Sequence, residues 1–114
     1  MQRHIYDCNS GCPVESTLQI ISGKWKSVII YHLFQNEICH FGQLQRELVD
    51  CSRRMLALQL NDLEQDGIIE KNVHQLNPLK TDYQLTEFGK TLEPVIEAMA
   101  NWGELYNQKE ASNE

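Results

Sequence analysis

Two adjacent arginines follow a serine in the segment Ser52-Arg53-Arg54, and another arginine, Arg46, lies shortly before them. A guanidinium group can donate two parallel hydrogen bonds to a guanine edge or to phosphate oxygens. The chain as a whole is acidic, with a formal net charge of -6, but residues 82–114 hold two Lys or Arg against seven Asp or Glu. We therefore expect any surface that binds a polyanion in the first two thirds of the chain.

The residues after Ser52 have the spacing of a helix that buries one face. Leu56, Leu60 and Leu63 recur at i, i+4 and i+7. Ser52 suits the N-cap, and Gly67 suits the left-handed position that closes a helix. The face opposite the leucines is then the candidate base-reading surface. It comprises Arg54, Ala57, Leu58 and Asn61.

The chemistry of that face matches base edges in a DNA major groove. Arg54 suits guanine, Asn61 suits adenine, and the apolar Ala57 or Leu58 suits a thymine methyl group. Other polar residues are better placed for phosphates, which fix the register without reading sequence. These are Ser52, Arg53 and Arg46 at or near the start of the helix, Lys71 and Lys80 on a predicted hairpin, and Lys24 and Lys26, which open an earlier predicted helix. Taken singly, each charged residue could equally be part of a solvated surface.

Four cysteines, Cys8, Cys12, Cys39 and Cys51, supply a second kind of chemistry. Cys12 precedes Pro13 at the start of a predicted helix, where the helix dipole favours a thiolate. Cys12 is therefore a candidate redox sensor, and Cys51 is either a resolving partner from another subunit or a packed residue. Cys8 and Cys39 are expected to take no part. Because no Cys-x-x-Cys pair is present, we expect no metal and no cofactor.

The predicted elements follow one another along the chain in the order of a winged helix-turn-helix. Helices are expected over about 13–22, 24–34, 41–48 and 52–66. Strands are expected over 68–73 and 82–85, joined by a polar loop with a turn at Asn77-Pro78. A last helix begins after Thr86 and runs to about 106, with a kink or restart at Pro94. The expected fold is mainly α with a small β-hairpin, in a single domain over 1–114.

Several segments of the chain resemble the HxlR-type branch of the MarR-like winged-helix regulators. They are CPVESTLQIISGKWKSVIIYHL, FGQLQREL, SRRMLALQLNDLEQDGII, YQLTEFGKTLEPVIEAM and WGE, within residues 12–104. The resemblance implies a homodimeric bacterial transcription regulator that binds a palindromic operator in double-stranded DNA. It places the helix-turn-helix at about 41–66 and the wing at about 68–85. It also implies electrophile or disulfide-stress sensing at Cys12. Ala57, Leu58 and Asn61 depart from the polar or basic residues common in the family, so the operator sequence is left open.

An apolar stripe on the terminal helices predicts the dimer. The last helix carries more apolar surface than one small core can cover, and the alternative is that it folds back on its own domain. The expected interface residues lie on helices 13–22 and 86–106. They are Val14, Leu18, Leu92, Val95, Ile96, Met99, Trp102 and Tyr106.

Other classes of function remain as alternatives at this point. The chain could be a winged-helix regulator that binds a small ligand, with silent cysteines, or a winged-helix module that binds proteins. No enzyme is expected, since the sequence has no Gly-rich phosphate loop and no Ser-x-x-Lys or His-Glu-x-x-His pattern. No apolar run reaches membrane-spanning length and no secretory signal is evident, so a cytoplasmic location is expected.

Overall fold

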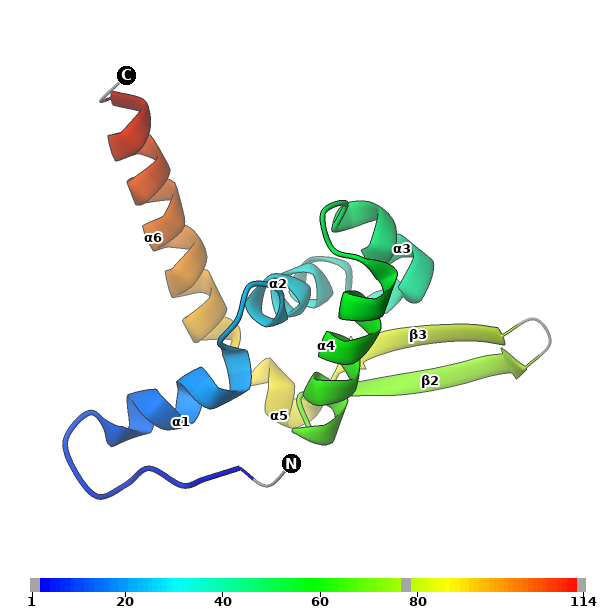
Figure 1. The fold of residues 1–114 in the computed structure, drawn as a ribbon, viewed down its shortest axis with the longest axis horizontal. Helices are drawn as coiled ribbons and strands as arrows, with labels where there is room; N and C mark the ends of the chain where they lie inside the picture. Colours follow the sequence, from blue (N-terminus) through cyan, green and yellow to red (C-terminus); the bar gives the residue numbers. More distant parts are fainter. Residues whose placement is uncertain (1–2, 77–78, 113–114) are drawn as a thin grey trace.

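The computed structural model describes residues 3–76 and 79–112. Its helices are α1 (Cys12–Ile21), α2 (Lys26–Asn36), α3 (Phe41–Glu47), α4 (Arg53–Gln65), α5 (Glu87–Lys90) and α6 (Glu93–Ser112). Its strands are β1 (Ile38–His40), β2 (Ile69–Leu76) and β3 (Leu79–Leu85), which form one antiparallel sheet in the order β1-β3-β2. The architecture is the predicted winged helix-turn-helix (Figure 1).

One hydrophobic core joins the helix-turn-helix to the base of the wing. Ile29, Ile30 and Leu33 enter it from α2, and Leu56, Leu60 and Leu63 from α4, as their spacing predicted. The core is closed by Ile68, the residue before β2, by Ile69 of β2 and by Leu85 of β3. Because α4 buries its leucines here, its other face is held towards solvent.

The sheet differs from the predicted two-stranded hairpin. β1 adds a third strand, pairing Ile38 with Gln84 and His40 with Asp82. The two wing strands are also longer than predicted, since residues 74–76 and 79–81 belong to β2 and β3 rather than to a loop. Polar residues there obscured the strand pattern, and an irregular register between Val73 and Gln75 breaks the alternation. The predicted Asn77-Pro78 turn lies outside the described residues.

The helix boundaries follow local signals. Ser52 Oγ accepts a hydrogen bond from the Met55 amide at 3.1 Å, and Gly67 has a φ of 74°, so both predicted ends of α4 are confirmed. Thr86 Oγ1 caps α5 through the Gly89 amide at 2.9 Å. The restart at Pro94 is also confirmed, because α5 ends at Lys90 and α6 begins at Glu93. α2 begins at Lys26 instead of Lys24, and α6 extends beyond the predicted end at 106.

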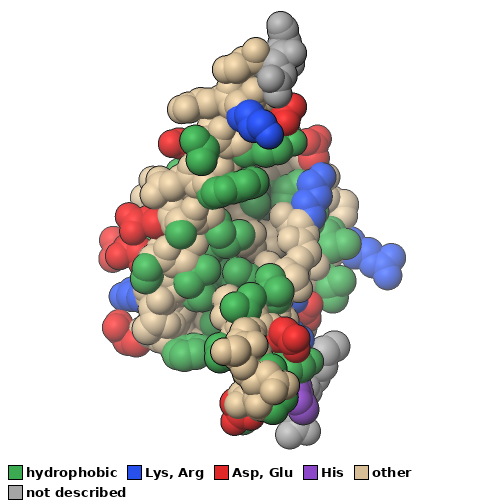
Figure 2. Space-filling view, turned by 90° about the vertical axis from the view of Figure 1, so that its left-hand side faces the viewer, with side chains coloured by type: hydrophobic (Ala, Val, Ile, Leu, Met, Phe, Trp, Pro, Cys, Tyr) green, Lys and Arg blue, Asp and Glu red, His purple; other side chains and the backbone are tan. Residues whose placement is uncertain are grey.

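The wing and the terminal helices lie at opposite ends of the molecule (Figure 1). α6 projects away from the helix-turn-helix, with α1 and the residues before it on the same side. Hydrophobic side chains gather on that side (Figure 2). Within the described residues, no helix is both long and apolar enough to cross a membrane.

Candidate nucleic-acid interface

The amino terminus of α4 presents the two adjacent arginines to solvent. Arg53 is the first residue of the helix, and both Arg53 and Arg54 are exposed. The Arg53 guanidinium lies over the ring of Phe41, with its Cζ 5.4 Å from the centroid. This cation–π contact ties the start of α4 to the start of α3.

The two faces of α4 are segregated as the sequence indicated. Leu56, Leu60 and Leu63 are buried. The four residues of the candidate base-reading face are all exposed, and Leu58 leaves about half of its side chain open to solvent (51%). They are Arg54, Ala57, Leu58 and Asn61. The exposed side chains of this face thus include both polar and apolar groups.

A groove separates α4 from the wing. It has a volume of about 680 Å³ and is lined by Phe41, Arg53 and Ala57 on the helical side and by Lys71, Lys80 and Tyr83 on the wing. Lys71 and Lys80 are exposed. Three cations therefore face one groove in a protein whose net charge is negative, which concentrates positive potential at this place.

Sequence reasoning missed part of this groove because it missed β1. His40, the last residue of β1, lines the groove beside Phe41, and Tyr83 lies opposite Cys39 in the sheet. A single period-2 triplet, Ile38-Cys39-His40, was the available signal. It is too short to distinguish a strand from a turn.

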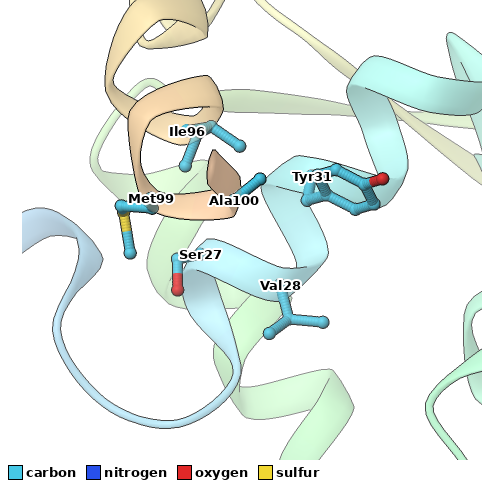
Figure 3. Close-up of a pocket in the computed structure, with 6 residues that line it drawn as sticks. All are labelled: Ser27, Val28, Tyr31, Ile96, Met99 and Ala100. Carbon is cyan, nitrogen blue, oxygen red and sulfur yellow. The ribbon is translucent and has the colours of Figure 1, made fainter. Parts of the chain in front are cut away.

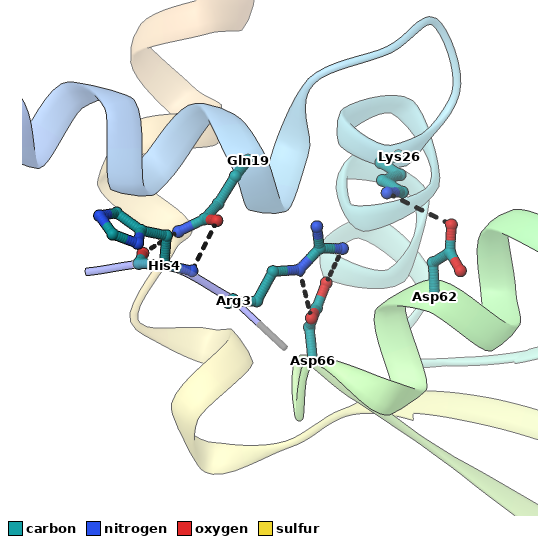
Figure 4. A network of polar contacts seen from close by, with 6 residues as sticks. All are labelled: Arg3, His4, Gln19, Lys26, Asp62 and Asp66. Carbon is teal, nitrogen blue, oxygen red and sulfur yellow. Dashed lines mark hydrogen bonds and ion pairs between the residues drawn. The ribbon is translucent and has the colours of Figure 1, made fainter. Parts of the chain in front are cut away.

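The remaining predicted phosphate contacts have different surroundings. Arg46 on α3 and Ser52 before α4 are exposed. Lys24 is exposed with its Nζ 4.7 Å from the Trp25 ring centroid. Lys26, in contrast, is 8% exposed and its Nζ lies 3.5 Å from Asp62 Oδ2 of α4 (Figure 4). Lys26 thus helps to hold α4 against α2. Because it is buried, we no longer assign it to the predicted phosphate contacts.

A buried carboxylate organises the middle of the wing. Asp82 on β3 accepts a hydrogen bond from Asn72 Nδ2 at 3.0 Å and also contacts the His74 ring, both on β2. Burial alone would raise the pKa of Asp82. The hydrogen bonds from Asn72 and His74, with the charge of His74 and His40, outweigh burial and hold the pKa below its usual value.

The expected dimer residues divide into two groups. Ile96 is only 5% exposed and belongs to the core of its own chain, with Leu92 and Val95 packed against that core. The others remain open to solvent: Val14, Leu18, Met99, Trp102 (65%) and Tyr106. The Trp102 and Tyr106 rings stack with centroids 5.9 Å apart. Leu105 adds to this exposed apolar surface and was missed by the stripe analysis.

A small apolar hollow lies between α2 and α6 (Figure 3). Its volume is about 280 Å³, and its walls are Val28 and Tyr31 of α2 with Ile96, Met99 and Ala100 of α6. It opens towards the same side as the exposed apolar residues of α6.

The cysteines have four distinct environments. Cys12 is the first residue of α1 and is 8% exposed. Cys39 and Cys51 are buried, and burial raises the pKa of both thiols; for Cys51 the charge of Lys24 opposes that effect. Cys8 is exposed, and its Sγ lies 3.5 Å from Cys12 Sγ. That proximity was not expected from the sequence.

A winged helix-turn-helix with a solvated, cation-bearing α4 defines a DNA-binding transcriptional regulator of the helix-turn-helix type. Residues 20–111 match the model of the HxlR-like helix-turn-helix family, and the chain belongs to this family.

Relatives from Bacillus subtilis (strain 168) agree with this assignment. The uncharacterized HTH-type transcriptional regulator YdeP is 48% identical over 99 residues, which cover 87% of this chain and 77% of YdeP. The uncharacterized HTH-type transcriptional regulator YybR is 45% identical over 103 residues, which cover 90% of this chain and 82% of YybR.

Solved structures give the same fold. The redox regulator HypR in its reduced form superposes on this chain with a TM-score of 0.81 and is 43% identical to it in sequence. The match covers 88% of this chain and 98% of the HypR chain. The reduced form of the transcriptional regulator YodB from B. subtilis superposes on this chain with a TM-score of 0.69 and is 32% identical to it in sequence. The match covers 81% of this chain and 89% of the YodB chain.

Proposed function

We propose that this chain is a sequence-specific regulator that binds a palindromic DNA operator as a homodimer. The observation that carries the proposal is the exposed face of α4. Arg54 and Asn61 lie there opposite the buried leucines, and Ala57 of the same face lines a groove with three cations. In winged-helix and related folds the second helix of the pair enters the major groove with its amino-terminal residues on base edges.

Base reading is assigned to the exposed face of α4. Arg54 pairs with guanine and Asn61 with adenine, while Ala57 and Leu58 contact thymine methyl groups. The cations around the groove bind phosphates and set the register. These phosphate contacts are Arg53 and Ser52 at the start of α4, Arg46 on α3, Lys71 and Lys80 on the wing, and Lys24 before α2.

The homodimer is inferred from the apolar side formed by α1 and α6. Val14, Leu18, Met99, Trp102 and Tyr106 are exposed there, and hydrophobic side chains gather on this side of the molecule (Figure 2). A large exposed apolar surface of this kind marks a protein–protein contact. A two-fold partner seated on this side would place two α4 helices on one face of a duplex. Their half-sites would lie one helical turn apart, about 10 base pairs.

Regulation through thiols is the effector mechanism that we favour. The chain is similar to HypR, which is described as a redox regulator, and to YodB, whose diamide-treated form is a separate solved structure. Cys12 is the proposed sensing residue, with Cys51 as a second candidate. The hollow between α2 and α6 supports the alternative of a small apolar ligand, because a volume of about 280 Å³ accommodates only a small molecule.

Selection of bound duplexes from a random pool, with and without diamide, tests the function. We expect an enriched inverted repeat whose recovery changes with oxidant. Affinity for the enriched duplex should fall steeply with salt, because phosphate binding releases counterions. Recovery of no sequence above background at low ionic strength would contradict the proposal and favour a protein-binding module.

A further inference from the structure

The turn before α1 brings two thiols together within one chain. Cys8 Sγ and Cys12 Sγ are 3.5 Å apart, and a disulfide needs about 2.05 Å. We propose that Cys8 and Cys12 are an intrachain disulfide site, in which the exposed Cys8 reacts first with a two-electron oxidant of the peroxide class. On this proposal Cys12 senses the oxidant through Cys8: it resolves the oxidised Cys8, so its first partner is Cys8 of the same chain and not Cys51.

The backbone holds the turn in the shape that this pairing requires. The Cys12 amide donates to the Asn9 carbonyl at 3.1 Å, and the Val14 amide donates to the Gly11 carbonyl at 3.0 Å. Gly11 has a φ of 92°, a left-handed conformation that residues with a side chain rarely adopt. The chain therefore reverses sharply between the two cysteines, and both sulfurs lie on the same side of the turn.

The residues before the turn are anchored as well, so Cys8 is not at a free end. The Arg3 guanidinium binds the Asp66 carboxylate through two contacts of 2.8 Å (Figure 4). The His4 amide donates to Gln19 Oε1 at 3.1 Å, and the Tyr6 amide donates to Ser16 Oγ at 3.1 Å. Contacts to α1 and to the end of α4 thus hold the segment that carries Cys8 beside the segment that carries Cys12.

The two sulfurs differ in access, which sets the order of events. Cys8 is exposed, whereas Cys12 is 8% exposed. The side-chain Nδ2 of Asn9 lies 3.6 Å from Cys8 Sγ and donates towards it. A dissolved oxidant therefore meets Cys8 first, and Cys12 is the nearby thiol that resolves the product.

With hydrogen peroxide the chemistry balances as follows. The Cys8 thiol releases its proton and its sulfur attacks one peroxide oxygen, so the O–O bond breaks and Cys8 becomes a sulfenic acid. The hydroxide that leaves takes up the released proton and becomes one water. The Cys12 thiolate then attacks Cys8 Sγ, the S–O bond breaks, and a second water leaves as the S–S bond forms. The two thiols lose two electrons and two protons, and the peroxide is reduced to two waters.

Tryptic mapping of the whole folded protein gives a direct readout. Cleavage after Arg3 and Lys24 yields peptide 4–24, which contains both Cys8 and Cys12, whereas Cys51 lies in peptide 47–53 and Cys39 in peptide 27–46. The protein is treated with hydrogen peroxide, free thiols are alkylated, and the digest is analysed by mass spectrometry. We expect peptide 4–24 to lose two hydrogen atoms and to carry no alkyl group.

Matched variants separate this pairing from others. Cys51→Ser and Cys39→Ala should leave the oxidised peptide 4–24 unchanged, whereas Cys8→Ser and Cys12→Ser should abolish it. Circular dichroism before oxidation checks that each variant is folded. Three results would overturn the proposal: a cross-link between peptides 4–24 and 47–53, recovery of peptide 4–24 with both cysteines alkylated, or a sulfinic acid in that peptide without a disulfide. The readout is independent of DNA, so its failure is distinguishable from failure of the proposed operator binding.

Discussion

Arg54 and Lys71 are both exposed cations near the groove, but they are expected to act on different parts of the DNA. Arg54→Ala should weaken binding to the selected operator by about tenfold to a hundredfold and relax the preference for one base, because a bidentate base contact is lost. Lys71→Ala should weaken binding to all duplexes alike and reduce the salt slope by about one. Fluorescence anisotropy over a series of salt concentrations measures both quantities.

The matched control for these two variants is Lys109→Ala, an exposed cation on α6 at the other end of the molecule. It should leave affinity and salt slope unchanged. If Arg54→Ala behaved like Lys71→Ala, with sequence preference intact, the assignment of Arg54 to base reading would be wrong.

Asp82 gives the wing a pH-dependent stability. The pKa of Asp82 is lower in the folded state than in the unfolded chain, where it is near 4. Charged Asp82 therefore stabilises the fold at pH values above about 4, and this contribution is lost as the pH falls through the folded-state pKa. Asp82→Asn should therefore lower the free energy of unfolding by about 1–3 kcal/mol at pH 7, and the difference from wild type should shrink towards pH 3. Urea unfolding at several pH values measures this.

The control is Asp50→Asn, at an exposed carboxylate in the turn before α4. It should change the unfolding free energy less than Asp82→Asn does, since the Asp50 side chain is exposed to solvent. A pH-independent difference between Asp82→Asn and wild type would show that the carboxylate's charge is not the stabilising feature.

At the scale of the elements, the sequence predicted best what neighbouring residues determine. α4 was predicted because Ser52, three spaced leucines and Gly67 all lie within it. β1 was missed because its strand state depends on pairing with residues 82–84, more than forty positions away. The exposed face of the candidate site followed from helical periodicity. The Lys26–Asp62 ion pair did not, because it depends on how two separate helices pack. The Cys8–Cys12 approach did not either, because it depends on the left-handed turn at Gly11, which the residue types alone did not indicate.

Two glycines near the junction of α4, β2 and α5, Gly67 and Gly89, differ in the space available for a side chain. A Cβ on Gly89 would lie 2.0 Å from the Ile68 carbonyl oxygen, and that backbone atom cannot rotate away. A Cβ on Gly67 would meet nothing within 4 Å, so its cost is the positive φ alone. Gly67→Ala should cost about 1 kcal/mol, and Gly89→Ala should cost more than that, because α5 must move off Ile68.

Chemical denaturation of the two alanine variants tests this ordering. The midpoint should fall below wild type for Gly67→Ala and further for Gly89→Ala. Equal midpoints for the two variants would show that α5 can shift off the Ile68 carbonyl with little loss.

At the scale of the whole molecule, DNA binding and assembly are assigned to opposite ends. Four glutamates, Glu93, Glu97, Glu104 and Glu110, lie on α6, at the end of the molecule opposite the cations of the wing (Figure 1). This separation suits a dimer in which α6 is kept from the phosphates while the two α4 helices face the duplex.

Trp102 offers the sharpest test of that assembly, because it is 65% exposed on α6 and stacks on Tyr106, another exposed apolar residue of the same helix. Trp102→Glu places a charge where a partner would bury it, so sedimentation should report a monomer for this variant and a dimer for wild type. Because a monomer engages one half-site, its operator affinity should fall by about 10²–10⁴-fold. Val73→Glu, at an exposed apolar position on the wing, should remain dimeric. A Trp102→Glu dimer with intact operator affinity would mean that the two copies meet elsewhere.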